Sequence, residues 1–198
     1  MSRGRIVWMA TGNHHKFEEA REVLSEMGVE LRHLEVDRVE IQADDLATIA
    51  AFSLDQLAES KERPVVVEDA GLFIDRFGGF PGPYSSYVLD TIGLKGVLKL
   101  MEGVDERDAS FGSVVAFRHG EETRCFRGSV KGRIARSIRG TAGFGYDPIF
   151  IPNEGDGRTF GEMKSEEKNA LSHRARAFRA LGEWLTHPSK GFLIGGPS

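Results

Sequence analysis

Apolar runs and helical periodicities alternate along the first third of the chain. Residues 6–10 form a short apolar run that predicts a buried strand. In the helix predicted after it, apolar residues recur every three or four positions, and Gly28 is a suitable end. The run 64–67 is rich in valine, which is typical of a strand buried on both faces. The predicted elements are strands over 6–10, 29–36 and 64–67 and helices over 14–27 and 45–60.

The pattern changes after residue 68. A glycine- and proline-rich loop over 78–83 precedes a predicted helix over 84–101. Two strand-like segments, 110–118 and 122–130, are joined by His119-Gly120, as expected for an antiparallel hairpin. A short strand near 132–136 and a last helix ending near residue 185 complete the prediction.

This order of elements predicts an α/β fold with a long central mixed sheet flanked by helices. We expect a single domain over residues 1–187, in two lobes with an active-site cleft between them. Residues 188–198 are rich in glycine and proline and are expected to form a flexible tail.

Composition excludes several classes of function. The chain has 198 residues, of which 40% are hydrophobic and 28% charged, as in an ordinary globular protein. A formal net charge of -4 argues against a nucleic-acid-binding or membrane-surface role. The single cysteine, Cys125, excludes an internal disulfide framework and fits a cytoplasmic location. The apolar run near the start is too short for a signal sequence or a membrane span.

The turn between the first strand and the first helix is a candidate phosphate site. It reads Thr11-Gly12-Asn13-His14-His15-Lys16. The first N–H groups of a helix lack internal partners and attract anions, and Lys16 adds a positive charge. A capped turn with a solvated lysine explains the same residues equally simply. The adjacent positions of His14 and His15 place them on different sides of the helix, which favours solvated side chains over a metal site.

Glu68 and Asp69 directly follow the valine-rich run, where we expect the strand to end. Ligands of α/β sheets bind outside the carboxyl ends of strands. A hard cation such as Mg²⁺ needs one or two carboxylates beside water and phosphate oxygens. Glu40, after the second strand, could supply the other carboxylate. The simpler alternative is that Glu68 or Asp69 caps the next turn.

Two later segments could contact a nucleotide. In Gly143-Phe144-Gly145-Tyr146-Asp147-Pro148, a tight loop could present an aromatic face to a base and a carboxylate to its N–H groups, although such an aromatic is often only a packing residue. Lys168 and Arg174 could neutralise phosphate or donate to a base carbonyl, and Ser172 could cap a helix. His173 fits a hydrogen-bonding role better than that of a nucleophile's base.

The order of these motifs resembles the ITP/XTP pyrophosphatase family, also called Ham1-like. The matching stretches are Thr11-Gly12-Asn13-x-x-Lys16, Glu40-Ile41-Gln42, Glu68-Asp69-x-Gly71-Leu72, Gly79-Phe80-Pro81-Gly82-Pro83-Tyr84-Ser85, Phe144-Gly145-Tyr146-Asp147-Pro148, and Glu162-Met163 with Glu167-Lys168-Asn169-x-x-Ser172-His173-Arg174.

The resemblance implies a homodimeric, Mg²⁺-dependent enzyme that hydrolyses ITP, dITP and XTP to monophosphate and pyrophosphate. Glu40 and Asp69 would bind the metal, and Asp69 would accept the proton of the attacking water. Thr11, Gly12, Asn13, His14, His15 and Lys16 would hold the triphosphate, and Ala70 would contact the substrate through its backbone N–H. Phe144, Gly145, Tyr146 and Asp147 would stack on and read the base, and Lys168, His173 and Arg174 would complete the nucleotide pocket.

Two positions depart from the family pattern. Ala70 stands where relatives commonly have serine or threonine after the catalytic aspartate. Many relatives also have a lysine on the second helix, near the position of Phe52 or Ser53. Two other functions stay open: a Maf-like pyrophosphatase for other modified nucleotides, and a nucleotide sensor without catalysis.

Overall fold

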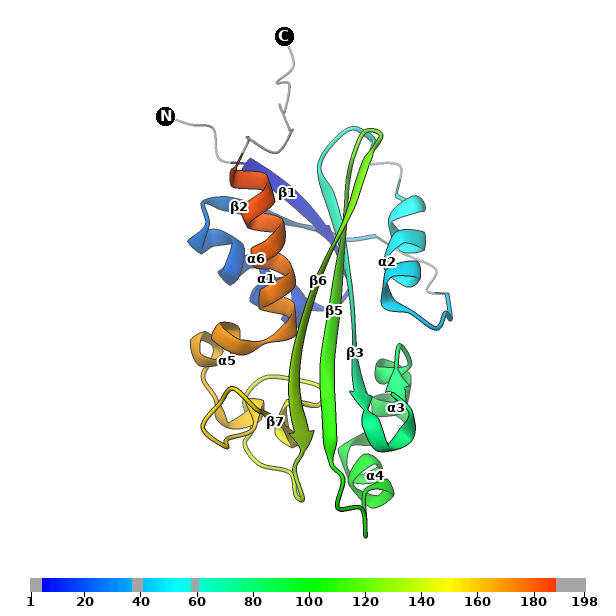
Figure 1. Cartoon of the computed structure of the whole chain (residues 1–198). Coiled ribbons are helices and arrows are strands. Elements are labelled where there is room, and N and C mark those ends of the chain that lie inside the picture. The colour runs from blue at the N-terminus through cyan, green and yellow to red at the C-terminus, as the bar shows by residue number, and fades with distance from the viewer. Residues whose placement is uncertain (1–4, 37–40, 58–60, 188–198) are drawn as a thin grey trace.

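The computed structural model describes residues 5–36, 41–57 and 61–187. Its centre is a seven-stranded mixed sheet in the order β2-β1-β3-β5-β6-β7, with β4 paired to β3. Three long strands, β3, β5 and β6, run through the molecule, with α1 and α6 on one face and α2 on the other (Figure 1). The predicted mixed sheet with flanking helices is therefore confirmed.

The first half is built from two parallel crossovers. β1 (Arg5–Ala10) leads through α1 (His14–Glu26) to β2 (Val29–Leu34), and α2 (Leu46–Asp55) leads to β3 (Val65–Ile74). β1 pairs in parallel with both β2 and β3. Side-chain caps begin both helices, because Asn13 accepts from the Lys16 N–H and Asp45 accepts from the N–H groups of Ala47 and Thr48.

The valine-rich strand is much longer than predicted. It does not end at Glu68-Asp69 but continues to Ile74, because β5 (Asp108–His119) pairs antiparallel with all ten of its residues. Val66 packs in the core beneath α1 and α6, whereas Val65 and Val67 pack in the core beneath α2. Helices thus cover both faces, which explains the continuous apolar run.

The middle segment differs from prediction at two points. The predicted helix over 84–101 is two helices, α3 (Ser85–Thr91) and α4 (Gly93–Leu100), because Gly93 adopts a positive φ of 64° between them. The predicted short strand near 132–136 is the end of β6 (Glu122–Ile134), which forms the expected hairpin with β5.

The last third contains one strand that the pattern did not reveal. β7 (Phe150–Pro152) is a three-residue edge strand paired with the end of β6. Single-turn 3-10 helices occupy Asp75–Phe77, Asp147–Ile149 and Phe160–Glu162. α5 (Ser165–Leu171) and α6 (His173–Thr186) follow, and Ser172 caps α6 as predicted by accepting from the Ala175 N–H.

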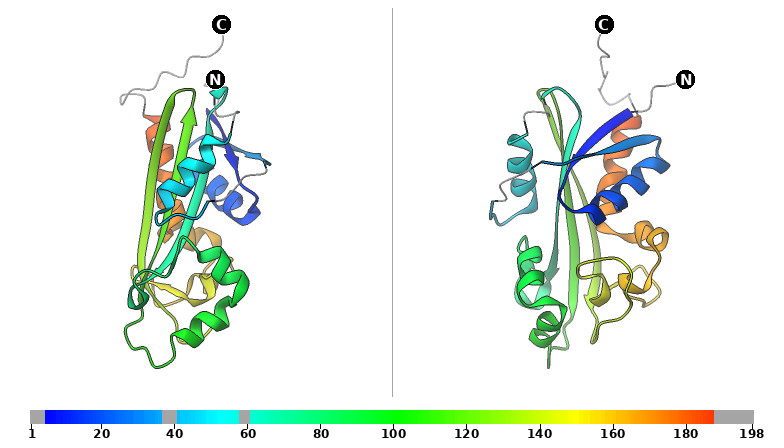
Figure 2. Two further views of the ribbon diagram at one scale, coloured as in Figure 1. Left: turned by 90° about the vertical axis from the view of Figure 1, so that its right-hand side faces the viewer. Right: turned by 180° about the vertical axis from the view of Figure 1, so that it is seen from behind.

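In the described ranges, one edge of β3 has a stretch without a neighbouring strand, residues 67–71, which we call the gap. β1 pairs with Val65 and Val66 on this edge, and β4 (Pro81–Gly82) pairs with Leu72 and Phe73. On this edge, and among the described residues, no strand pairs with residues 67–71, whereas β5 pairs with them on the opposite edge. The two ends of the sheet also have separate cores, one around α1 and α6 and one around α3, α4 and β7. Figure 2 shows both ends of the sheet from the side and from behind.

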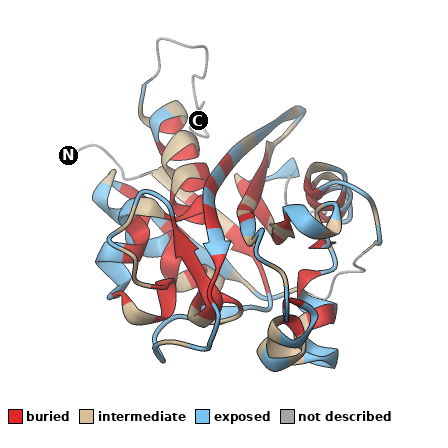
Figure 3. Ribbon diagram, turned by 60° about the horizontal axis from the view of Figure 1, so that its bottom comes forward, coloured by how far each residue is buried: buried red, intermediate tan, exposed pale blue. Residues whose placement is uncertain are grey.

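Buried residues follow the sheet and the inner faces of the helices, and exposed residues follow the outer helix faces and loops (Figure 3). Within the described part of the chain, no helix is long and apolar enough to cross a membrane. Glu40, the end of the predicted helix over 45–60 and the predicted tail over 188–198 lie outside the described residues. The division of residues 1–187 into two lobes stays a prediction.

Candidate active site

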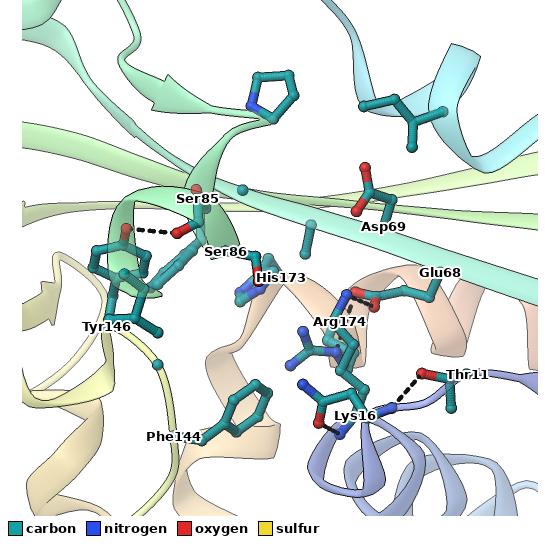
Figure 4. Close-up of a pocket in the computed structure, with 18 of the residues that line it drawn as sticks. Thr11, Lys16, Glu68, Asp69, Ser85, Ser86, Phe144, Tyr146, His173 and Arg174 are labelled. Atoms are coloured by element: carbon teal, nitrogen blue, oxygen red, sulfur yellow. Dashed lines mark hydrogen bonds and ion pairs between the residues drawn. The ribbon is translucent and has the colours of Figure 1, made fainter. Parts of the chain in front are cut away.

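A pocket of about 330 Å³ opens at the gap in the edge of β3, within the size range of small-molecule sites (Figure 4). Its wall is formed by residues from several parts of the chain. These include the turn over residues 11–16, which we call the phosphate turn, β3, the start of α3, the loop before the 3-10 helix Asp147–Ile149, α5 and the start of α6. The pocket brings together most of the predicted site residues, namely Thr11, Gly12, Asn13, Lys16, Asp69, Ala70, Phe144, Gly145, Tyr146, Asp147, Lys168, His173 and Arg174.

The phosphate turn is held by short local hydrogen bonds. Thr11 Oγ1 accepts from the Asn13 N–H at 3.1 Å, and Asn13 Oδ1 accepts from the Lys16 N–H at 3.2 Å. His33 on β2 donates from Nε2 to the Thr11 carbonyl at 2.6 Å. These contacts fix the entry into α1, whose first N–H groups are the anion-attracting end of the helix.

The two histidines of the turn, His14 and His15, lie outside the pocket lining, unlike the other four residues of the turn. His14 is exposed, and its Nε2 lies 3.7 Å from Glu18 Oε1. His15 stacks on Phe144, with ring centroids 5.2 Å apart and ring planes at 15°. Both histidines are exposed, as the prediction of solvated side chains requires, and His15 in addition contacts a pocket-lining ring.

Glu68 is fully buried among cations. Its Oε1 accepts from Ser113 Oγ at 2.7 Å and from Arg174 Nε at 3.1 Å, and its Oε2 lies 3.0 Å from Lys16 Nζ. Burial alone would raise the pKa of Glu68, but Arg174, Lys16 and the Ser113 hydroxyl lower it to about 2. Glu68 is thus an ionised partner of protein cations.

Asp69 lies on the other face of β3. The alternation of side chains along a strand turns it toward α2, away from Arg174 and Lys16, as Figure 4 shows. Both carboxylates nevertheless line the pocket, because the gap exposes the edge of β3 from both sides. Their position in mid-strand replaces the predicted position at a strand end.

Glu19 on α1 connects Lys168 and Arg174, the two buried basic residues of the pocket. Lys168 Nζ lies 2.5 Å from Glu19 Oε1, and Arg174 Nη1 lies 2.6 Å from Glu19 Oε2. Lys168 Nζ also lies 2.6 Å from Asp147 Oδ2. A row of alternating charge, buried except at its last member, therefore runs beside the pocket in the order Asp147, Lys168, Glu19, Arg174, Glu68, Lys16.

The end of the pocket that contains Lys168 and Arg174, which we call the base end, also contains the Phe144 ring and the neutral imidazole of His173. Lys168 Nζ and Arg174 Cζ lie 4.9 Å and 5.2 Å from the centre of the Phe144 ring. His173 stacks on Phe111 at 4.5 Å, and burial, followed by Arg174, holds the pKa of His173 well below its usual value. Among the described residues, no group bonds its buried Nδ1. An unsatisfied buried nitrogen in a pocket wall indicates a ligand contact.

Asp147 is held at its place in the loop. Its Oδ2 accepts from the Phe144 N–H at 2.8 Å as well as from Lys168. Burial raises the pKa of Asp147, and Lys168 opposes that shift. Tyr146 donates its hydroxyl to the Ser85 carbonyl at 2.7 Å, and burial raises its pKa. This hydrogen bond therefore connects the loop over residues 143–148 to the start of α3.

Sequence reasoning missed Glu19, Ser113 and His33, and it left the choice between Phe52 and Ser53 open. Glu19 follows Lys16 by three positions, which places both on one side of α1, and this spacing was a usable signal. Ser113 faces Glu68 across the β3–β5 pairing, which no local pattern reveals. Ser53 is buried on α2 and lines the pocket, whereas Phe52 is 39% exposed and does not.

A metal ion would need carboxylates of this pocket. Within residues 5–36, 41–57 and 61–187, no group of three or more histidine, cysteine, aspartate or glutamate side chains is arranged to hold one. Asp69 lines the pocket, whereas its predicted partner Glu40 falls outside these ranges.

Comparison with known proteins extends the likeness over nearly the whole chain. The Ham1 family model matches residues 7–184. The chain is 49% identical over 181 residues to a dITP/XTP pyrophosphatase of Hyperthermus butylicus, covering 91% of this chain and 95% of that protein. It is 50% identical over 186 residues to a dITP/XTP pyrophosphatase of Methanopyrus kandleri, covering 93% and 98%.

Solved structures agree with these sequence matches. A HAM1 protein from Coxiella burnetii superposes with a TM-score of 0.79 at 30% identity, covering 92% of this chain and 98% of that one. The Ham1 protein of Staphylococcus aureus superposes with a TM-score of 0.76 at 25% identity, covering 91% and 98%. With a family model, close relatives and fold all in agreement, the chain belongs to the Ham1 family.

Proposed function

We propose that this protein hydrolyses non-standard purine nucleoside triphosphates, namely ITP, dITP and XTP, to the monophosphate and pyrophosphate. One observation carries the proposal: a single pocket has an anion-attracting helix start with Lys16 at one end and Phe144 with Lys168 and Arg174 at the other. The first end suits a triphosphate and the second a purine base. The relatives named dITP/XTP pyrophosphatases support the same substrates.

We also propose that the pocket binds a divalent cation, Mg²⁺. Glu68 balances Arg174 and Lys16, and Asp69 lines the pocket from the opposite face of β3, so we assign the metal to Asp69. Mg²⁺ commonly binds one or two carboxylates together with substrate phosphates. Asp69 would hold it with Glu40, and a bound Mg²⁺ would neutralise charge on the phosphate oxygens.

Asp69 is proposed as the base of the reaction. A water oxygen forms a bond to the α-phosphorus, the bond from that phosphorus to the bridging oxygen breaks, and pyrophosphate leaves. The Asp69 carboxylate takes the proton of the water. The N–H groups at the start of α1 and the Lys16 ammonium would hold the phosphates and offset the charge that develops on the leaving group.

Arg174 and Lys168 are proposed to read the carbonyl at position 6 of the purine. A guanidinium has five N–H donors and an ammonium has three. Each cation makes two contacts to carboxylates, which leaves donors for a ligand. ATP presents an amino group at this position, so a buried donor would lose its acceptor and ATP would be disfavoured.

The predicted homodimer and cytoplasmic location belong to this proposal as well. Several large apolar side chains are exposed around β4 and α3, with Phe80 at 42% and Tyr87 at 68%. Exposed aromatic residues are enriched where proteins associate. Light scattering coupled to size exclusion would measure the mass in solution, and a monomer would contradict the dimer.

A substrate series tests the function. Pyrophosphate release is measured with and without Mg²⁺ for ITP, dITP, XTP, GTP, ATP and a modified pyrimidine triphosphate. We expect kcat/KM for ITP to exceed that for ATP by at least about 100-fold. Equal values would contradict the proposal, preference for the modified pyrimidine would support a Maf-like enzyme, and binding without release would support a sensor.

A further inference from the structure

The His15 ring stacks on the Phe144 ring, which lines the pocket. Their centroids are 5.2 Å apart and their planes differ by 15°. His15 lies in the first turn of α1, next to the phosphate turn, and Phe144 lies in the loop at the base end. This contact therefore joins the two segments that are proposed to hold opposite ends of the nucleotide.

The two rings relate differently to the pocket. Phe144 lines it, together with the two cations near its ring, Lys168 and Arg174. His15 does not line the pocket and is exposed. His15 thus packs against a pocket-lining ring without lining the pocket itself.

The main chain at Phe144 is held by hydrogen bonds with Asp147, and these hydrogen bonds do not involve the ring. Gly143 and Gly145 flank it with positive φ angles of 70° and 63°, and glycine is the residue with the fewest conformational limits. Two hydrogen bonds fix the main chain there, from the Phe144 N–H to Asp147 Oδ2 and from the Asp147 N–H to the Phe144 carbonyl, and neither involves the ring. The direction of the ring consequently depends on its side-chain contacts, of which the His15 stack is one.

We propose that His15 is a positioning residue that braces Phe144 against the base of the substrate. The inference rests on the proposed function, because Phe144 must meet a base for the brace to matter in binding. His15 acts through its ring on Phe144 and does not act as a positive charge on phosphate. An aromatic pair contributes a factor of roughly two to ten in an equilibrium constant.

The kinetic test separates a brace from a phosphate contact. His15→Ala is expected to raise KM for ITP about two- to tenfold, leave kcat close to the wild-type value and leave the inhibition constant of inorganic tripolyphosphate unchanged. His15→Phe, which keeps a ring and removes the ring nitrogens, should restore KM. In a Phe144→Ala background, His15→Ala should have no further effect on KM. His119→Ala, at the tip of the β5–β6 hairpin, is the matched histidine control.

Three results would overturn the brace: a parallel rise in the tripolyphosphate inhibition constant, failure of His15→Phe to restore KM, or an equal effect of His15→Ala with and without Phe144. His15→Asn provides a second ring-less variant, and a thermal unfolding midpoint near the wild-type value confirms that each variant folds.

A readout without nucleotide keeps this test separate from the proposed function. Fluorophenylalanine placed at position 144 reports the surroundings of that ring by ¹⁹F NMR. His15→Ala should move its resonance, whereas His119→Ala should not, and an unmoved resonance in His15→Ala would contradict the brace. Failure of the wild-type protein to hydrolyse ITP would contradict the proposed function and leave this result standing.

Discussion

Glu68 and Asp69 are consecutive residues of β3, yet their side chains face opposite sides of the sheet (Figure 4). Glu68 contacts Arg174, Lys16 and Ser113, and Asp69 lines the pocket from the side of α2. The same chemical group therefore has two roles. One carboxylate balances buried cations, and the other is proposed to serve the metal and the water.

Asp69→Asn should fold and lose most turnover. An amide cannot accept the proton of the attacking water, and general-base catalysis contributes about 10²- to 10⁴-fold. We expect kcat for ITP to fall by at least about 100-fold, measured as pyrophosphate release. Asp75→Asn, an exposed aspartate after β3, is the control and should keep wild-type kcat. Near-normal turnover in Asp69→Asn would contradict both assigned roles.

Ionisation of Glu68 should make the free energy of unfolding depend on pH in the acidic range. Its pKa in the folded protein is about 2, below the ordinary value of 4.5, so its contribution is complete above about pH 4.5 and is lost as pH falls toward 2. The loss should be on the order of 3 kcal/mol in the free energy of unfolding.

The measurement is urea unfolding of the wild type and of Glu68→Gln across this range. Taking the difference between the two proteins removes the titration of the other carboxylates. A difference that does not change between pH 4.5 and 2 would show that Glu68 does not carry this dependence.

Glu19→Gln should destabilise the protein by about 3 kcal/mol, because it leaves Lys168 and Arg174 buried without the carboxylate they share. Adding Lys168→Met removes one of these charges and should recover part of the loss. Urea unfolding of the two single variants and the double variant measures the coupling. Strictly additive effects would contradict an interaction between Glu19 and Lys168.

Removal of divalent metal should stop turnover and leave the fold intact. The three cores are apolar clusters of the sheet and helices, so chelation by EDTA should leave the thermal unfolding midpoint unchanged. Added Mg²⁺ should restore pyrophosphate release. Full activity in EDTA would contradict the proposed cofactor, and a large fall in the midpoint would indicate a structural metal.

Ser53→Lys should strengthen the hold on the triphosphate. Ser53 lines the pocket from α2, so a lysine there can place an ammonium beside the phosphates. We expect KM for ITP to fall about three- to tenfold, the effect of one added charge-assisted hydrogen bond. Phe52→Lys, on the neighbouring and more exposed position, is the matched control and should not change KM.

The fold of the first half was predictable because its elements are amphipathic or fully apolar. β1, α1 and β2 lie within about two residues of the ranges expected from periodicity. The length of β3 was not predictable from residues 68–71, since their polar and small side chains are held in a strand by pairing with β5. The break at Gly93 depends on a backbone angle that periodicity does not report.

The candidate site was predictable as a set of motifs and not as a network. The positions of Lys16, Lys168 and Arg174 in the motifs identified three cations. Their shared partners Glu19 and Glu68 come from α1 and β3, and the contacts to α5 and α6 span long distances in sequence. Pairing of that kind depends on the tertiary fold. The fold also determines that Ser53, and not Phe52, lines the pocket.

The gap on the edge of β3 has a consequence for how substitutions act. Leu72 donates its N–H to Ser85 Oγ at this edge, and N–H groups of alternate strand residues point to the same edge, so the N–H of Ala70 points into the gap. A main-chain donor persists with every residue except proline at the position. Alanine in place of a hydroxyl residue at position 70 would therefore remove a side-chain donor to substrate and keep the backbone donor.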